Sequence, residues 1–402
     1  MTLAIFHSGF PGGDPEAIRS YLTPPYDSIR ANVAQLRTLV GFAAGPPPAD
    51  PPVTYAANEK SYAGYLQGKY EFGAVAGLRF DGVIGVRGVK TDLTIDGTSR
   101  SGGMLIPIVI GNSYTDWLPN ASARIRFTDE LQLRLSVTKT RTRPNFAQYN
   151  PGLNVDPPGA GVRNANGGNP NLQPLKSTNY DVSLEYYFAR AGSASGAIFR
   201  RDLYGFIQNY SQDIFDPVFG PIQVNRPYNS SRGRIDGAEA QVTAFANIDG
   251  LPDWAHGFGI QANVTYLDAK TGTPGALGGA TTLVPIVGVS KWIYNLVGIY
   301  EHDKIAMRLS YNLRGKYLSS GGYDNGSRAY TETTGAIGRL DSSGSYDLFK
   351  NVTLTADATN ILGKPLSVTG TSVFANNGPV ATFPRSVRHE ESLYSLGVRF
   401  RF

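Results

Sequence analysis

Strands of alternating polarity, connections that alternate in length, and the lack of any long apolar run predict an all-β fold for this chain of 402 residues. Each strand carries apolar side chains on one face and polar side chains on the other, with a period of two. No run approaches the roughly 20 apolar residues of a membrane-spanning helix, and mean hydropathy is -0.21. A barrel strand needs only about ten alternating residues to cross a membrane, so we expect an antiparallel up-and-down transmembrane β-barrel.

The first 58 residues differ from the remainder of the chain. Ile18 to Leu39 has loose helical spacing, and the proline-rich stretch from Gly45 to Pro52 then interrupts any regular structure. We expect residues 1–58 to be an extracellular loop or linker remnant, and residues 59–402 to be a portion of a barrel.

About thirteen strands follow from residue 59 onward. The clearest are Leu131 to Thr138, Ile305 to Arg314 and Tyr394 to Phe402, in which apolar and polar residues alternate almost without error. Ser193 to Gln208 is a weaker strand, because the charged residues from Arg200 to Asp202 interrupt its alternation.

The connections between these strands alternate between short and long. Short ones fall at Thr128–Glu130, Ala189–Ser193, Ile248–Ala255, Glu301–Asp303 and near Lys350, and long ones cover 98–113, 143–176, 211–230, 271–289, 319–338 and 363–389. Outer-membrane barrels have short periplasmic turns and long extracellular loops. A soluble sandwich gives no reason for such alternation.

Several classes of function are excluded or left without support. The chain has no cysteine, which removes disulfides and thiol chemistry. A net charge of +5 without any block of like charges gives no support to nucleic-acid binding. The four histidines are scattered and no catalytic or nucleotide motif occurs, so we expect no enzyme activity, no cofactor and no metal.

The polar faces of the strands predict a charged lumen, because a charged side chain facing lipid at the bilayer midplane costs about 2 to 4 kcal/mol. The candidate lumen residues are Arg124, Arg126, Arg134, Asp181, Glu185, Glu239, Arg308, Arg314, Asp357, Arg399 and Arg401. They would either favour anionic or hydroxylated solutes or pair with one another. Ligand capture would use rings and amides of the long loops. The candidates are Tyr149, Asn150, Asn164, Asn166, Asn169, Tyr228, Tyr323 and Asn325.

Three segments resemble the TonB-dependent outer-membrane receptors. Arg143 to Phe146, Asn169 to Pro174 and Ser177 to Phe188 together resemble the late-barrel signature of that family, and Ala358 to Gly363 is similar to the motif after its penultimate strand. The last strand, with Tyr394, Leu396, Val398, Phe400 and Phe402 on one face, resembles the signal read by the barrel assembly machinery. The resemblance covers residues 59–402.

The resemblance implies an outer-membrane receptor that takes up a scarce nutrient, a siderophore-like chelate or a carbohydrate. Its partners would be outer-membrane lipid, the assembly machinery, a small-molecule nutrient, and TonB through a plug domain. Family members begin with a signal peptide, a TonB box and a plug domain, followed by about 22 strands. None of that first half is visible here, so we expect only the C-terminal part of a barrel. The alternatives are a passive porin-like pore, a soluble β-rich glycan-binding or structural protein, and a non-functional truncated fragment.

Overall fold

The computed structural model describes most of the chain. The described residues are 4–7, 20–23, 25–45, 51–75, 77–101, 104–156, 163–189, 191–216, 220–229, 232–246, 249–273, 282–323, 329–373 and 380–401.

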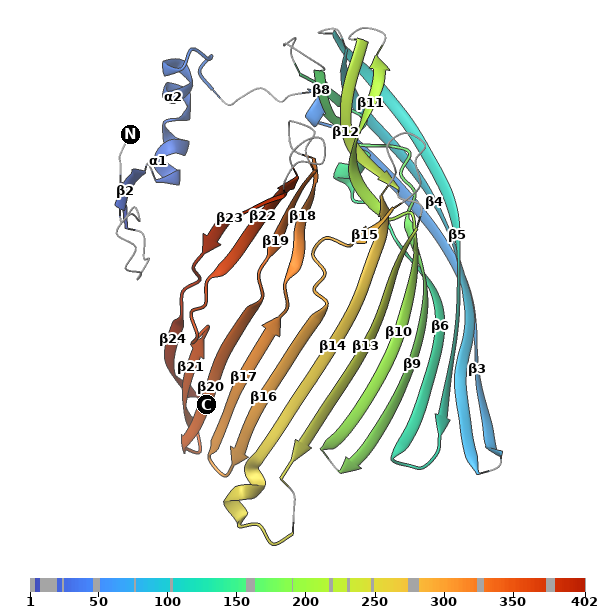
Figure 1. Cartoon of the computed structure of the whole chain (residues 1–402), viewed down its shortest axis with the longest axis vertical. Coiled ribbons are helices and arrows are strands. Elements are labelled where there is room, and N and C mark those ends of the chain that lie inside the picture. The colour runs from blue at the N-terminus through green and yellow to red at the C-terminus, as the bar shows by residue number, and fades with distance from the viewer. Residues whose placement is uncertain are drawn as a thin grey trace.

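Thirteen strands form one long antiparallel sheet, here called the wall (Figure 1). In chain order they are β3 (Ala56–Val75), β4 (Leu78–Ser101), β5 (Met104–Arg126), β6 (Leu131–Thr142), β9 (Leu175–Ala189), β10 (Gly192–Tyr204), β13 (Gly233–Phe245), β14 (Phe258–Thr273), β16 (Trp292–His302), β17 (Ile305–Arg314), β20 (Ile337–Phe349), β21 (Val352–Thr359) and β24 (Leu393–Phe400). Each pairs with the strand before it and the strand after it in this series, and the short β15 (Thr282–Pro285) adds to β14. The up-and-down topology and the number of strands in this path confirm the prediction, although the first strand begins at Ala56.

The wall has two chemically different faces, because residues paired across strands lie on the same face. One row joins Asp81, Arg124 and Arg134 through successive partners, and this charged side is called the inner face. A row on the other side joins Leu309, Gly298 and Ile260. The apolar residues of β24 are also on this outer face, where Leu396 is 90% exposed. The alternation read from the sequence therefore describes an apolar surface and a charged surface.

The wall curves, with β3 at one edge and β24 at the other (Figure 1). Within the described part of the chain, each of these strands pairs on one side only. Thirteen strands that alternate in direction leave β3 and β24 pointing the same way, from the loop side to the turn side.

Four of the segments expected as long loops, 98–113, 211–230, 319–338 and 363–389, are largely strands, which corrects that prediction. Residues 98–113 are nearly all within β4 and β5, which rise together as a hairpin. Segment 319–338 contains most of β18 (Tyr317–Tyr323) and all of β19 (Ala329–Thr334), and segment 363–389 contains β22 (Leu366–Val373) and β23 (Val380–Arg388). These four strands form a sheet in the order β18-β19-β22-β23, matching the wall order β17-β20-β21-β24 below it. The wall thus continues upward after short breaks that contain Gly315, Gly335 and Gly363.

The remaining loop strands form a separate layer, here called the loop sheet. It contains β7 (Leu153–Val155), β8 (Arg163–Gly167), β11 (Ile207–Asp216) and β12 (Gly220–Asn229), in the order β11-β12-β8-β7. Its strands extend the wall strands β6, β9, β10 and β13, yet β12 lies between β11 and β8 and pairs with β8 in parallel. The loop sheet therefore does not follow the strand order of the wall.

Helices are few and short. The segment expected as loop or linker contains β1 (Ala4–His7), β2 (Ser20–Thr23), α1 (Tyr26–Ala31) and α2 (Val33–Leu39), followed by the 3-10 helix η1 (Pro51–Val53). Two further 3-10 helices, η2 (Phe146–Tyr149) and η3 (Asp253–Gly257), lie in connections between strands. The helical spacing around Leu39 is confirmed by α2. Of the helices that the structure describes, none combines the length and apolar character required to cross a membrane.

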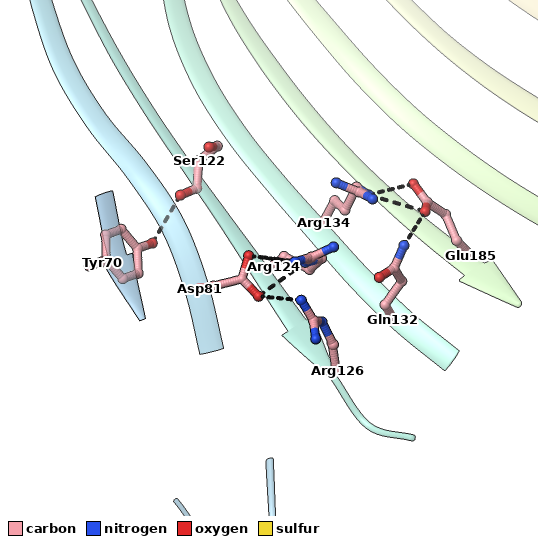
Figure 2. A network of polar contacts seen from close by, with 8 residues as sticks. All are labelled: Tyr70, Asp81, Ser122, Arg124, Arg126, Gln132, Arg134 and Glu185. Atoms are coloured by element: carbon pink, nitrogen blue, oxygen red, sulfur yellow. Dashed lines mark hydrogen bonds and ion pairs between the residues drawn. The ribbon is translucent and has the colours of Figure 1, made fainter. Parts of the chain in front are cut away.

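A tyrosine crosses over a glycine at the edge of the wall. The Tyr70 hydroxyl on β3 reaches past Gly82 on β4 and donates a hydrogen bond of 2.9 Å to the carbonyl oxygen of Ser122 on β5 (Figure 2). A Cβ atom at Gly82 would lie 2.1 Å from that oxygen and 2.3 Å from the Tyr70 hydroxyl. Glycine is therefore required for three strands to be joined in this way.

We predict that Gly82→Ala displaces the Tyr70 ring, breaks its hydrogen bond and destabilises the protein by about 1 to 3 kcal/mol. The measurement is the urea midpoint of the chain in detergent micelles, followed by tryptophan fluorescence. Gly64→Ala is the matched control, because a Cβ atom at Gly64 on β3 has no neighbour within 4 Å. Equal midpoints for the two variants would refute the role given to Gly82.

Candidate functional site

Near the turns, the inner face carries a cluster of charged side chains that form ion pairs with one another. The Arg124 guanidinium contacts both oxygens of Asp81, with Nε 3.0 Å from Oδ1 and 3.1 Å from Oδ2, and Nη2 2.9 Å from Oδ1. Arg126 Nη2 lies 3.2 Å from Oδ2 of the same carboxylate. Two cations thus share one carboxylate, and the register between β4 and β5 positions all three (Figure 2).

A second part of the cluster lies on β6 and β9. Arg134 and Gln132 both contact Glu185, with an Arg134 Nε to Oε1 distance of 2.9 Å. Asp181 is paired with Arg201 of β10, which the sequence analysis did not include, at 2.5 Å. Arg134 and Asp181, together with the Asp81 group, border a hollow of about 820 Å³ on the inner face, which Lys69 and Glu71 of β3 also line.

The remaining candidate lumen residues lie further along the wall. Arg308 contacts Glu301 at 3.1 Å, and Glu239 accepts a hydrogen bond of 3.5 Å from Thr265. Arg314 donates to the Gly288 carbonyl at 2.5 Å and lies over the Tyr317 ring. Asp357 and Arg399 occupy inner-face positions by register, and Arg401 follows β24, where its backbone donates to Asn351. Many charges of the inner face are therefore satisfied by neighbouring strands.

The hydrophobic core of the chain lies on the loop side. Leu93 and Ile95 of β4 pack with Tyr149 and Leu172, and none of these four side chains is more than 2% exposed. Along β5, residues on the inner face such as Tyr114 are covered, whereas alternate residues such as Val109 are exposed. The loops therefore fold onto the inner face of the hairpin formed by β4 and β5.

Tyr149 belongs to this core and does not present its ring to a solute, contrary to the sequence-based prediction. Its side chain is fully buried at the end of η2. Burial, with a contribution from neighbouring Tyr114, raises the pKa of the Tyr149 hydroxyl above its ordinary value. We therefore assign Tyr149 a structural role.

Asparagine side chains stabilise the irregular segments around this core. The Asn169 side chain donates to the Pro227 carbonyl at 3.0 Å and accepts from the Asn171 amide, while Asn150 donates to Pro52 at 3.0 Å. From β5, Asn112 donates to the carbonyl oxygens of two residues within Asn169–Pro174. Asn150 and Asn169, both predicted as ligand contacts, are thus engaged within the loops.

A buried ion cluster joins the hairpin to the wall. Asp116, whose side chain is 1% exposed, contacts Arg141 Nη1 at 2.6 Å through Oδ2 and Lys176 Nζ at 2.8 Å through Oδ1. Arg141 also donates to Thr91 at 3.2 Å, and it lies against the Tyr114 ring. Nearby, Arg143 pairs with Glu59. These ion pairs tie β5, β6 and β9 together at the level where the loops begin.

The loop sheet has one covered face and one exposed face. Ala165, Ile222 and Val224 are fully buried, with Leu153, Val155 and Ile214 packed against them. The opposite side, here called the amide face, has two rows in register: Asn154, Asn166, Asn225 and Ser211 in one, and Asn164, Gln223 and Asp213 in the other. All are exposed except Gln223, which is half-buried.

The predicted ligand residues are therefore divided among several places. Asn164 and Asn166 lie on the amide face, whereas Tyr228 stacks against Arg226 on β12 at 5.1 Å. For Tyr323 the structure describes only the backbone, and Asn325 and Phe402 lie outside the described residues. The sequence-based prediction did not include Asn154, Ser211, Gln223 and Asn225. The period-two alternation within 207–229 could have indicated the last three.

No group of three histidine, cysteine, aspartate or glutamate residues in the described part of the chain is arranged to hold a metal ion.

Comparison with known proteins identifies the family. The family model for the TonB dependent receptor-like β-barrel matches residues 16–361. A search of curated protein sequences found no match. Among solved structures, a variant of the ferric enterobactin receptor of Pseudomonas aeruginosa in complex with enterobactin is 15% identical, with a TM-score of 0.51, covering 85% of this chain and 54% of that one.

Two further solved structures have a similar fold. The siderophore receptor PirA of Acinetobacter baumannii is 13% identical with a TM-score of 0.51, covering 86% of this chain and 55% of that one. The copper transporter OprC is 16% identical with a TM-score of 0.53, covering 86% and 49% respectively. At these identities the likeness shows the fold, and the chain spans about half the length of the receptors it matches.

The ion cluster around Asp116 leads to a stability prediction. Asp116→Ala leaves the nearly buried Arg141 without its partner, so we expect a loss of about 3 kcal/mol in the free energy of unfolding. Asp129→Ala is the control, because its pair with Arg79 is at the surface and contributes less than about 1 kcal/mol. Urea unfolding in micelles measures both. A loss below that of the control would contradict the structural role of the cluster.

Tyr210 of the loop sheet leads to a pH prediction. Burial raises the pKa of Tyr210 to about 12, and its hydroxyl donates to Gln208 at 2.5 Å. The folded state therefore keeps the phenol neutral, so the stability present below pH 10 is lost as pH rises toward about 12. Tyr210→Phe should make the decline in urea midpoint between pH 10 and pH 12 less steep. An unchanged slope would show that Tyr210 does not titrate within the fold.

Proposed function

Because the chain belongs to the TonB-dependent receptor β-barrel family, we propose that it forms the C-terminal wall and loops of a receptor that imports a scarce nutrient. The family is one of non-enzymatic transporters, and it places the chain in the outer membrane of a Gram-negative bacterium. The nutrient would be a siderophore-like chelate or a carbohydrate, taken up when the chain is part of a full-length receptor.

The observation that supports this function most is the two-faced wall. A predominantly apolar outer face suits lipid, and a charged inner face suits the lining of a solute pathway. The described wall is open between β3 and β24, and open edges are strongly disfavoured in lipid. Since these two edge strands point the same way, an antiparallel barrel closes only with an odd number of additional strands. A receptor of about 22 strands would supply about nine.

The parts of the chain would then have separate tasks. We assign residues 1–58 to an extracellular loop and residues 59–402 to the barrel. The C-terminal strand would serve recognition by the barrel assembly machinery, and TonB would act through a plug domain. The arginine-rich inner face would border the pathway and, in the hollow beside Asp81, contact that domain.

The odd number of wall strands predicts how the chain behaves alone. Transferred from detergent micelles to planar lipid bilayers, it should give no steady single-channel current. The reason is that closing the wall on itself requires a parallel seam between β3 and β24. Discrete, stable current would instead favour a passive pore.

A chimera tests whether the missing strands of a receptor allow the wall to close into a barrel. The plug and preceding barrel strands of the Pseudomonas aeruginosa ferric enterobactin receptor would be joined to this chain in place of the region that matches it. We expect a heat-modifiable closed barrel in outer membranes. A chimera with one strand fewer, which has the wrong parity, is the matched control. Equal insertion of both chimeras would contradict the argument from parity.

A further inference from the structure

The amide face of the loop sheet has the form of a binding surface. Its four strands are about 4.8 Å apart, and alternate residues along a strand are about 7 Å apart. Asn154, Asn166 and Asn225 lie side by side on three neighbouring strands, and Ser211 continues the row on the fourth. The result is a regular grid of hydrogen-bonding groups.

The orientation of the sheet follows from what covers its other face. The core that contains Leu93, Ile95 and Tyr149 also includes Ile207, the first residue of β11. At the start of β7, a Cβ atom on Gly152 would lie 2.8 Å from the Thr98 carbonyl of β4. The loop sheet therefore packs against the inner side of the hairpin, and its buried residues Ile222 and Val224 belong to the face opposite the amides.

The charge of the amide face favours one class of ligand. In the loop sheet, the two basic residues, Arg163 and Arg226, occupy positions that alternate onto the covered side with Ile222 and Val224. Within the two rows the charged residue is Asp213, which accepts a hydrogen bond of 3.2 Å from Gln223. A surface of amides without a cation is poorly suited to an anionic chelate or a phosphate. An amide, which both donates and accepts, suits a hydroxyl group.

An aromatic ring lies at the end of the same face. Phe215 follows Asp213 and Ser211 on the exposed side of β11 and is itself 77% exposed. A large apolar side chain so open to water at the end of a polar grid offers a flat surface for the apolar side of a ring-shaped ligand.

We propose that the amide face binds a neutral oligosaccharide, with Asn166 and Asn225 contacting its hydroxyl groups and Phe215 packing against a sugar ring. This inference rests on the proposed function and names the class of nutrient. It favours a carbohydrate over a charged chelate as the molecule first captured outside the barrel.

The test is calorimetric titration of the full chain in an amine-oxide detergent, which carries no sugar headgroup. The probes are maltoheptaose, cellohexaose, xylohexaose and mannohexaose, with the ferric complex of 2,3-dihydroxybenzoate as the charged comparison. We expect one or more of the oligosaccharides to bind, with an affinity unchanged between 50 and 500 mM salt because the oligosaccharide carries no charge. The ferric complex should not bind at this face.

Variants locate the site. The double variant Asn166→Ala with Asn225→Ala should weaken binding at least tenfold, and Phe215→Ala should weaken it severalfold. Asn58→Ala is the matched control, because Asn58 is also an exposed amide, on the outer side of β3. Replacing both asparagines by glutamine, which keeps the amides, should restore part of the affinity. Urea midpoints report whether each variant remains folded.

The proposal is overturned if none of the oligosaccharides binds to a chain with a native urea midpoint, or if the folded double variant binds as tightly as the unaltered chain. It is also overturned if the ferric complex binds and the double variant abolishes that binding. Failure of the proposed transport function would show instead in the chimeras, as a lack of barrel insertion. The two failures are therefore distinguishable.

Discussion

The hydrogen bonds of the backbone are the constraint on which the rest of this structure depends. In the apolar part of a membrane, each peptide group must find its partner within the protein. The wall meets this requirement with a continuous antiparallel ladder from β3 to β24. Once the ladder is continuous, side chains alternate between two surfaces, and the apolar and charged faces follow. Charged pairs such as Arg134 with Glu185 connect neighbouring strands along the ladder without interrupting it.

Beyond the membrane, water relaxes this constraint and the chain uses more ordinary means of stabilisation. The buried clusters lie on the loop side, around Tyr149, around Val224 and around Leu203. Irregular backbone such as Asn169–Pro174 is stabilised by the amide groups of Asn112 and Asn229. A membrane protein of this kind thus has its compact core outside the membrane, because the wall must place its apolar side chains toward lipid.

Local sequence was sufficient for the wall and insufficient for the layer above it. The alternation around Leu131 or Ile305 depends only on which residues face lipid, so strands could be placed without knowledge of their partners. The loop strands depend on distant partners: β8 pairs with β12, and η2 packs on β4. Tyr149 and Asn169 carry side chains that suit a ligand as well as a core, and only the tertiary contacts distinguish the two roles. Conversely, the sequence around Asn225 does not distinguish it from other loop asparagines. Only the strand pairing places it beside Asn166 on the amide face.

The parallel pairing of β8 with β12 bears on how the loop sheet folds relative to the wall. Residues 163–166 and 222–225 are far apart in the sequence and lie on either side of the paired strands β9 and β10, so we expect the loop sheet to form late in folding. The same contacts are the ones that can separate while the ladder below remains intact. The loop sheet is therefore a cooperative unit of its own, whose backbone amides would exchange with solvent sooner than those of the wall. Such a unit could be remodelled by evolution without changes to the strands that anchor the protein in lipid.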